Sequence, residues 1–512
     1  MRNEGIAAGA PGADRFVWHH IVFVAAALIW AVLTAVLSPP FGGTDVFHFK
    51  DAACNLAAGY GFETASVVFS QSFTREPYAS HVPLYPLLFA LHAFVFGCGA
   101  YANAAFELAL GLALASMFYA LCVRAIPTSL LRLCFALLCG VAIPFGCLLP
   151  TVDRYDVMAM AMVLALLLLR SNAIFAARAD LRDWLACGVV FLAQPFLGCI
   201  IFGTIVLLQS RILFAIRRPD LAWLATRAVL AWTGFLLPIA IWIVALETTE
   251  PGAWKRFYNH GLALIARKDL GFLDALNHAA LSAGLATLSN MGRYAITVVL
   301  LAPLLPALWR VCQKPLVMAL VFLALVPFVF PKQSSYFPAV AFLAVVLCHL
   351  TPPASRWQRL LSGLASVALV AMLIPMVLFD LVVRYHATAS FVAERTRIAE
   401  FARFVERERP GGLILVPGTH FFIAKPVLNR IFDYQYYQPA VHGTRDVAAA
   451  VACYTLDSTG GLEPQGYDLT LWPLHPILWQ SNPSADFITL LGRRIIARQW
   501  VWNCNYYLMP LH

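Results

Sequence analysis

The sequence predicts a polytopic α-helical membrane protein of about eleven spans with a small C-terminal α/β domain on the outer face. Of its 512 residues, 61% are hydrophobic and 12% are charged, whereas soluble domains are about 45–50% apolar and 25% charged. The charges are unevenly placed, because 22 of the 63 lie in the last 129 positions. We therefore divide the chain into a transmembrane region, 1–383, and an outward-facing region, 384–512.

Apolar stretches set the number of spans. A hydrocarbon core about 30 Å thick needs about 17 to 25 helical residues. Eleven stretches reach or approach this length, at 17–38, 102–123, 130–149, 155–170, 184–196, 197–215, 224–246, 293–311, 315–330, 335–350 and 360–383. The fifth and sixth are short and meet at Gln194-Pro195, which indicates a pair of tilted half-spans rather than one long helix.

Basic residues predict which side each loop occupies. With the N-terminus in the cytoplasm, 15 of the 24 Lys and Arg residues before position 384 fall in inner connectors, as the positive-inside rule requires. The loops 39–101 and 247–292 then face outward, as does the C-terminal region. The first span lacks a convincing cleavage site before Pro39-Pro40, so we interpret it as an uncleaved anchor. We expect the protein in the cell inner (plasma) membrane, with its C-terminal domain periplasmic or extracytoplasmic.

One apolar segment is too short to be a span. Leu84 to Gly97 opens with a proline-rich helix-start signal, but at 1.5 Å per residue it reaches only about 20 Å. We expect an interfacial or re-entrant helix within the first outer loop. Counting it as a span would reverse the sidedness of everything that follows.

The first outer loop, 39–101, is rich in ionisable residues, and such residues near a membrane face are natural functional candidates. If Asp45 caps the helix that follows, then Asp45, His48 and Asn55 share one helix face, and Asp51 points away from it. The spacing selects Asp45 with His48. Directly after Gly-Gly-Thr, however, Asp45 is equally well placed to serve only as a helix N-cap.

The motif in this loop resembles a known family. Asp45-x5-Asp51-Ala52-Ala53-x-Asn55-x3-Gly59-x-Gly61-Phe62, followed by Pro83-Leu84-Tyr85-Pro86-Leu87-Leu88, is similar to the first outer loop of the GT-C class of integral membrane glycosyltransferases. The bacterial branch similar to protein O-mannosyltransferases and to the aminoarabinose transferase of lipid A is the nearest match. Weaker matches are Tyr155-Asp156, Gln194-Pro195 where relatives often carry Lys-Pro, and Pro331-Lys332. His48 departs from the pattern, because an aromatic residue is common there.

The resemblance implies transfer of a sugar from a polyprenyl-phosphate carrier to an acceptor at the outer face, with inversion at the anomeric carbon. Asp45 would then be the general base, a role that can contribute about 10²–10⁴-fold to the rate. Fixed cations would stabilise the departing phosphate. The outward-facing candidates for that task are Arg75, Arg154 and Lys332, and the further substrate-site candidates are His48, Asp156 and Tyr85.

Each of these residues has a simpler alternative role. His48 would pack at the interface, Arg75 would pair with its neighbour Glu76 on the surface, and Lys332 would snorkel to the headgroups. The acidic and basic residues at 153–156 would form a solvated charge cluster. Asp45 and Asp156 could hold a divalent metal, since some members of the resembled class use one and others do not. Two scattered carboxylates are weak evidence for such a site, so we expect no required cofactor.

The sequence pattern of the C-terminal region predicts a small α/β domain. An amphipathic pattern over 390–409 predicts a helix that ends at Pro410-Gly411-Gly412, and short apolar runs predict strands at 413–416, 487–491 and 495–501. In an oxidising compartment four cysteines can form disulfides. They are Cys54, Cys98, Cys453 and Cys504, and mass spectrometry without reduction would settle the pairing of the last two.

Partners and competing functions follow from the same features. The +9 charge is spread without a basic run, so nucleic acid is not an expected partner, whereas membrane lipid, a polyprenyl-linked sugar and an acceptor lipid, glycan or protein are. Two other classes stay open: a lipid or glycan transporter or flippase, and a non-catalytic GT-C-like protein that binds glycolipid. Inverted repeats and charges deep within spans would favour a transporter. Repeats are not visible in the sequence, and ionisable residues deep within the spans are few, with Glu107 and Asp380 as the exceptions.

Overall fold

The computed structural model describes a large part of the chain. The described residues are 18–37, 49–64, 76–78, 81–125, 129–142, 155–175, 179–215, 221–255, 257, single helical positions between 356 and 392, 395–416, 421–426, 431–433, 447–456, 462–464, 475–480, 488–490, 493–495 and 503–508. The predicted spans 293–311, 315–330 and 335–350, and most of 360–383, lie outside them. The predicted total of eleven spans therefore stays a prediction.

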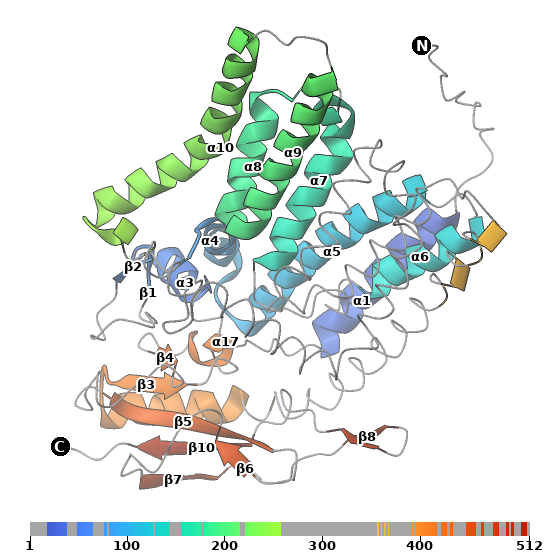
Figure 1. The fold of residues 1–512 in the computed structure, drawn as a ribbon. Helices are drawn as coiled ribbons and strands as arrows, with labels where there is room; N and C mark the ends of the chain where they lie inside the picture. The colour runs from blue at the N-terminus through green and yellow to red at the C-terminus, as the bar shows by residue number, and fades with distance from the viewer. Residues whose placement is uncertain are drawn as a thin grey trace.

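Helices dominate the first half of the described chain (Figure 1). They are α1 (Trp18–Leu37), α3 (Asp51–Ala57), α4 (Leu84–Phe96), α5 (Ala100–Ala125), α6 (Ser129–Ala142), α7 (Asp156–Phe175), α8 (Leu181–Ala193), α9 (Pro195–Ala215) and α10 (Leu221–Thr249). Each of the first seven predicted spans overlaps one of these helices, and α4 occupies the short segment predicted as a helix in the first loop. Within the described residues, Ala100–Arg124 and Ala222–Thr249 are long and apolar enough to cross a membrane.

The helices α8 and α9 separate where the sequence predicts a break. Gln194 between them has an extended backbone with φ −156° and ψ 108°, and Pro195 opens α9. The two helices then pack side by side, since the Trp184 and Phe202 rings lie 5.5 Å apart and Gly198 lies directly against Phe191. This segment is thus a tight helical hairpin and not one long helix, as the break at Gln194-Pro195 predicts.

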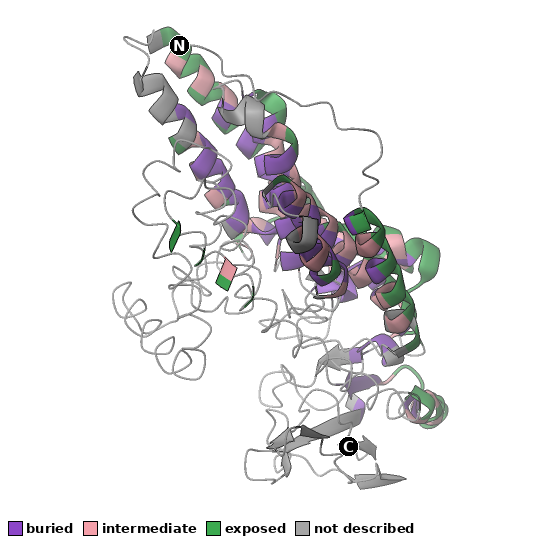
Figure 2. Ribbon diagram, turned by 90° about the vertical axis from the view of Figure 1, so that its right-hand side faces the viewer, coloured by how far each residue is buried: buried purple, intermediate pink, exposed green. Residues whose placement is uncertain are grey.

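The outer surface of the helical region is apolar. Figure 2 shows exposed positions along the sides of several helices, and on α10 they include Val229, Trp232, Ile241 and Val244. A water-soluble protein rarely exposes so many large apolar side chains on one helix. Contact with lipid tails accounts for it, which agrees with the composition of the region.

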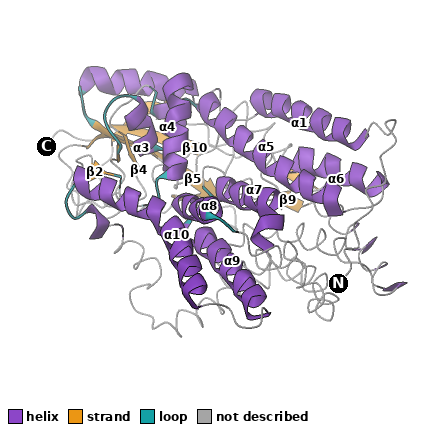
Figure 3. Ribbon diagram, turned by 90° about the horizontal axis from the view of Figure 1, so that it is seen from above, coloured by secondary structure: helices purple, strands orange, loops and turns teal. Residues whose placement is uncertain are grey.

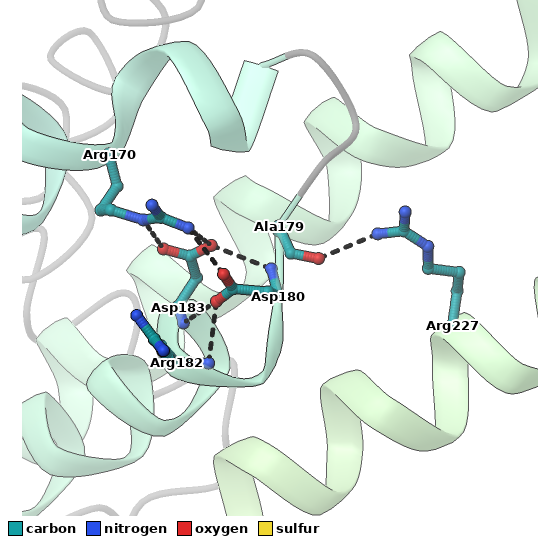
Figure 4. Close-up of polar contacts among 6 residues, drawn as sticks. All are labelled: Arg170, Ala179, Asp180, Arg182, Asp183 and Arg227. Atoms are coloured by element: carbon teal, nitrogen blue, oxygen red, sulfur yellow. Dashed lines mark hydrogen bonds and ion pairs between the residues drawn. The ribbon is translucent and has the colours of Figure 1, made fainter.

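A polar cluster joins α7 to the start of α8 (Figure 4). Asp180 caps α8 in a capping box with Asp183. The Arg170 guanidinium contacts both carboxylates, at 2.9 Å from Asp180 and 2.7 Å from Asp183. Arg227 of α10 donates to the carbonyl oxygen of Ala179 at 2.9 Å. These contacts join α7, α8 and α10 at one end of the helices.

The C-terminal region contains a mixed sheet in the order β4-β3-β5-β10-β7, with β6 paired to β5. Its strands are β3 (Leu413–Val416), β4 (Ile431–Asp433), β5 (Val447–Leu456), β6 (Leu462–Pro464), β7 (His475–Gln480) and β10 (Asn503–Leu508), while β8 (Ile488–Leu490) and β9 (Arg493–Ile495) form a separate pair. The strand predicted at 413–416 matches β3, and a helix at 395–408 lies within the predicted 390–409. Of the strand predicted at 495–501, only residue 495 is described, at the end of β9.

The connection between β3 and β4 matters for the candidate site. These strands are parallel, so the chain must cross over between them, and this crossover contains the short helix α17 (Phe421–Ala424). In Figures 1 and 3, α3 and α4 lie close to the strands of this sheet. One core of buried apolar side chains runs from the membrane helices through α4 to α17, the 395–408 helix and β3.

Candidate functional site

The described residues of the first loop converge on α3, which lies among α4, α5, the start of α7 and α17. Of the candidates named from the sequence, Tyr85 and Asp156 are described, and both are buried. The others fall outside the described residues; they are Asp45, His48, Arg75, Arg154 and Lys332. The roles of all seven stay predictions.

Lys50 is a buried cation just before α3. Its ammonium donates to the carboxylate of Glu107 at 2.5 Å and to the side-chain oxygen of Asn103. The Tyr85 hydroxyl donates to the same Glu107 oxygen at 2.5 Å. Because a buried charge is tolerated only when it is paired and hydrogen-bonded, this network ties the first loop firmly to α5.

Aromatic rings enclose the same ammonium. Its nitrogen lies 4.7 Å from the centroid of Phe89 and 5.4 Å from those of Tyr85 and Phe422. Ring faces attract cations at such distances. Lys50 is thus held from α4, α5 and α17 at once, and its position leaves it fully buried.

Asp51 is held on the other side of α3. One of its oxygens accepts from the Lys425 ammonium at 2.7 Å, and the other accepts from the Thr64 hydroxyl at 3.1 Å. Lys425 also donates to the side-chain oxygen of Asn55 at 2.8 Å, while the Asn55 amide donates to the Glu63 carbonyl at 2.7 Å. A lysine from the C-terminal region therefore completes the polar shell of a first-loop helix.

The prediction that Asp51 points away from the face of Asn55 is wrong. In the structure α3 begins at Asp51, so Asp51 and Asn55 lie one helical turn apart and share Lys425. The predicted face was counted from Asp45. Asp51 and Asn55 are four residues apart in the helix, however, and this spacing alone places them on one face.

Phe49 links α3 to the two described candidates. Its ring centroid lies 5.0 Å from that of Tyr155 and 6.2 Å from that of Tyr85, with both pairs edge to face. Asp156 follows Tyr155 as the first residue of α7 and is buried. Segments separated by about a hundred residues, each singled out from the sequence, thus meet at one place.

Tyr78 is another buried polar residue of the first loop, and no sequence pattern singled it out. Its ring packs 5.0 Å from Phe62. Within the described part of the chain its hydroxyl has no hydrogen-bond partner. Burial, and then the neighbouring Tyr155, raise the pKa of the Tyr78 phenol well above its usual range. The hydroxyl therefore stays protonated at ordinary pH and able to donate.

A disulfide closes the first loop. Cys54 of α3 is bonded to Cys98, which lies just before α5, with 5.8 Å between their Cα atoms. Cys453 and Cys504 are directly opposite in the antiparallel pairing of β5 and β10. All four cysteines predicted to be oxidisable are thus arranged in pairs, and the first pair is bonded in the structure.

The described site contains two ion pairs between buried or nearly buried side chains. Lys50 pairs with the carboxylate of Glu107, and Lys425 pairs with that of Asp51. The described residues contain no group of three His, Cys, Asp or Glu side chains arranged to hold a metal ion. The arrangement suits a rigid frame that positions a reactive loop beside a membrane.

No family model matches the chain, and neither does any curated protein. Solved structures do resemble it. ArnT from Cupriavidus metallidurans, bound to undecaprenyl phosphate, matches with a TM-score of 0.47 and 14% identity over 96% of this chain and 98% of its own. The oligosaccharyltransferase of Archaeoglobus fulgidus, tethered to an acceptor peptide, matches with a TM-score of 0.44 and 12% identity over 89% of this chain and 75% of its own.

Both matched proteins are GT-C glycosyltransferases, so the resemblance predicted from the first-loop motif is met again among solved structures. At TM-scores below 0.5, we take no residue role, substrate or mechanism from them. The function proposed below rests on the residues of this chain.

Proposed function

We propose that this chain is an inverting membrane glycosyltransferase that moves a sugar from a polyprenyl-phosphate donor to a lipid, glycan or protein acceptor at the outer membrane face. The observation that carries the proposal is the buried frame around α3, which places the GT-C-like first loop against the ends of α5 and α7. An apolar helical surface nearby suits a polyprenyl tail.

The disulfide supports the outward orientation of this loop. Cytosolic thiols are kept reduced, whereas disulfides persist in the periplasm and outside the cell. A bond between Cys54 and Cys98 therefore favours an outward first loop, as the positive-inside count predicts. The donor sugar would then be presented on the same side.

In this mechanism Asp45 accepts the proton of the acceptor hydroxyl as that oxygen attacks the anomeric carbon. The bond from the anomeric carbon to the phosphate oxygen breaks, and its electron pair stays on the polyprenyl phosphate. Cations near helix ends stabilise that developing charge, and Arg75, Arg154 and Lys332 are the proposed contributors. His48, Asp156 and Tyr85 line the substrate site, and no metal is required.

The test is transfer from a radiolabelled polyprenyl-phosphate sugar in membranes that contain either the natural chain or Asp45→Asn. We expect the variant to lose about 10²–10⁴-fold in rate. The matched control is Asp180→Asn, which removes a carboxylate at the polar cluster of α8 and keeps a good helix cap. Its transfer rate should equal that of the natural chain.

The outcomes separate the competing functions. Undiminished transfer by correctly inserted Asp45→Asn would exclude Asp45 as the base. Lipid movement without glycosyl product in the natural chain would favour a flippase. Binding of the labelled lipid with neither movement nor product would favour a non-catalytic glycolipid-binding protein.

A further inference from the structure

Among the described residues, the helix α17 brings the C-terminal sheet region into contact with the first loop. Phe421 and Phe422 are both almost fully buried. The Phe422 ring lies 6.1 Å from Phe89 of α4 and covers the Lys50 ammonium at 5.4 Å. Lys425 follows one turn later, and its backbone amide donates to the Phe421 carbonyl at 2.7 Å.

Lys425 has an unusual setting for a lysine. Its side chain is 9% exposed, and its partner Asp51 is 1% exposed. The ammonium is shared between the Asp51 carboxylate at 2.7 Å and the Asn55 side-chain oxygen at 2.8 Å. A charge pair buried to this degree demands close geometry, because each ion has given up its hydration.

The sheet restricts where Lys425 can go. Since α17 belongs to the crossover between parallel strands β3 and β4, it cannot shift far without disturbing them. On the other side, α3 is tied to α5 through Lys50 and Glu107. The Lys425 contact therefore joins two anchored bodies across 374 residues of sequence.

We propose that Lys425 is a positioning residue that docks the C-terminal sheet region on the first-loop helix α3 and so fixes the orientation of that helix. The docking stands on the contacts above. The effect of this docking on catalysis rests on the proposed glycosyl transfer. Asp45, the proposed general base, lies six residues before Asp51 in sequence, so the orientation of α3 would affect the position of that base. Lys425 acts through α3 and is not assigned to the reacting atoms.

The first measurement needs no substrate. Hydrogen exchange is compared between the natural chain and Lys425→Met, which keeps a long side chain and removes the ammonium. We expect exchange in peptides that cover α3 and α17 to accelerate about tenfold or more, while peptides from α8 and α9 stay unchanged. Lys425→Arg should restore most of the protection. The matched control is Arg407→Met, which removes an exposed cation from the same region.

A double-variant cycle tests the pairing itself. Asp51→Leu should also accelerate exchange in α17, and adding it to Lys425→Met should change little, because the pair is already broken. Strictly additive effects would show that the two residues act separately and would overturn the proposal. If Lys425→Met fails to insert, Lys425→Gln and Asp51→Asn are measured in its place with the same expectation.

The transfer assay adds the catalytic readout. We expect kcat to fall about tenfold or more in Lys425→Met with the donor KM changed less than about twofold, and Lys425→Arg to recover most of kcat. Unchanged exchange in α3 and α17 overturns the docking whatever the activity. Faster exchange with unchanged kcat overturns the positioning role. Absence of transfer in the natural chain overturns the proposed function, while the exchange data still decide the docking.

Discussion

Removal of the Cys54–Cys98 disulfide should cost a calculable amount of stability. The bond closes a loop with a sequence separation of 44 residues. In the chain-entropy relation, a closed loop of this size lowers the entropy of the unfolded chain by an amount worth about 4 kcal/mol at 25 °C. This figure is an upper value, since an unfolded chain still inserted in a micelle retains helical structure. We expect a loss of about 2–4 kcal/mol.

The assay is the free energy of unfolding in detergent, measured by denaturant titration for the natural chain and for the Cys54→Ala/Cys98→Ala double variant. Adding a reductant should lower the stability of the natural chain toward that of the variant and leave the variant unchanged. The matched control is Cys199→Ala, which removes an exposed free cysteine. A double variant within about 0.5 kcal/mol of the control, or no linked peptide in unreduced digests, would refute the reasoning.

Three further substitutions test other parts of the structure by the same titration. Glu107→Leu leaves Lys50 buried without its carboxylate and should destabilise by about 3–5 kcal/mol; adding Lys50→Met should recover part of that loss, and a purely additive result would contradict the pairing. A Cβ at Gly188 would meet the Phe235 carbonyl oxygen at 2.4 Å, so Gly188→Ala should force α8 from α10 at a cost of about 1–3 kcal/mol. Asp180→Ala should cost about 1 kcal/mol through loss of the α8 cap, whereas Asp180→Asn should retain most of that stability.

Local features of the fold were predictable from the sequence because they depend on neighbours along the chain. Apolar runs of sufficient length located α1 and α5 through α10, and proline after Gln194 located the break before α9. The short apolar segment after Pro83 proved to be α4. The strand Leu413–Val416 followed from a buried β-rich run beside a glycine pair, where Gly411 takes a left-handed backbone with φ 71°.

The candidate site was predictable only in part, because its contacts join distant segments. The first-loop motif led to Tyr85 and to the Tyr155-Asp156 pair, and the rings of Tyr85 and Tyr155 both contact Phe49. Lys425 was missed, since an isolated lysine after two phenylalanines carries no signal of a partner 374 residues earlier. Lys50 was passed over because a lysine in an outer loop is ordinarily solvated, and here four rings and two side-chain acceptors replace water.

The length of chain between Asp51 and Lys425 has a consequence for biosynthesis. At about 5–20 residues per second, a ribosome needs about 20 to 75 s to extend the chain from one to the other. The contacts from Lys50 to Glu107 and from Cys54 to Cys98 span only 57 and 44 residues, so they can form early. The nascent protein would thus assemble its first loop in two stages. The contacts with Glu107 and Cys98 form first, and the Asp51 carboxylate pairs with Lys425 only after that lysine has been translated. Chains that stop before residue 425 would carry an inserted but unfinished site.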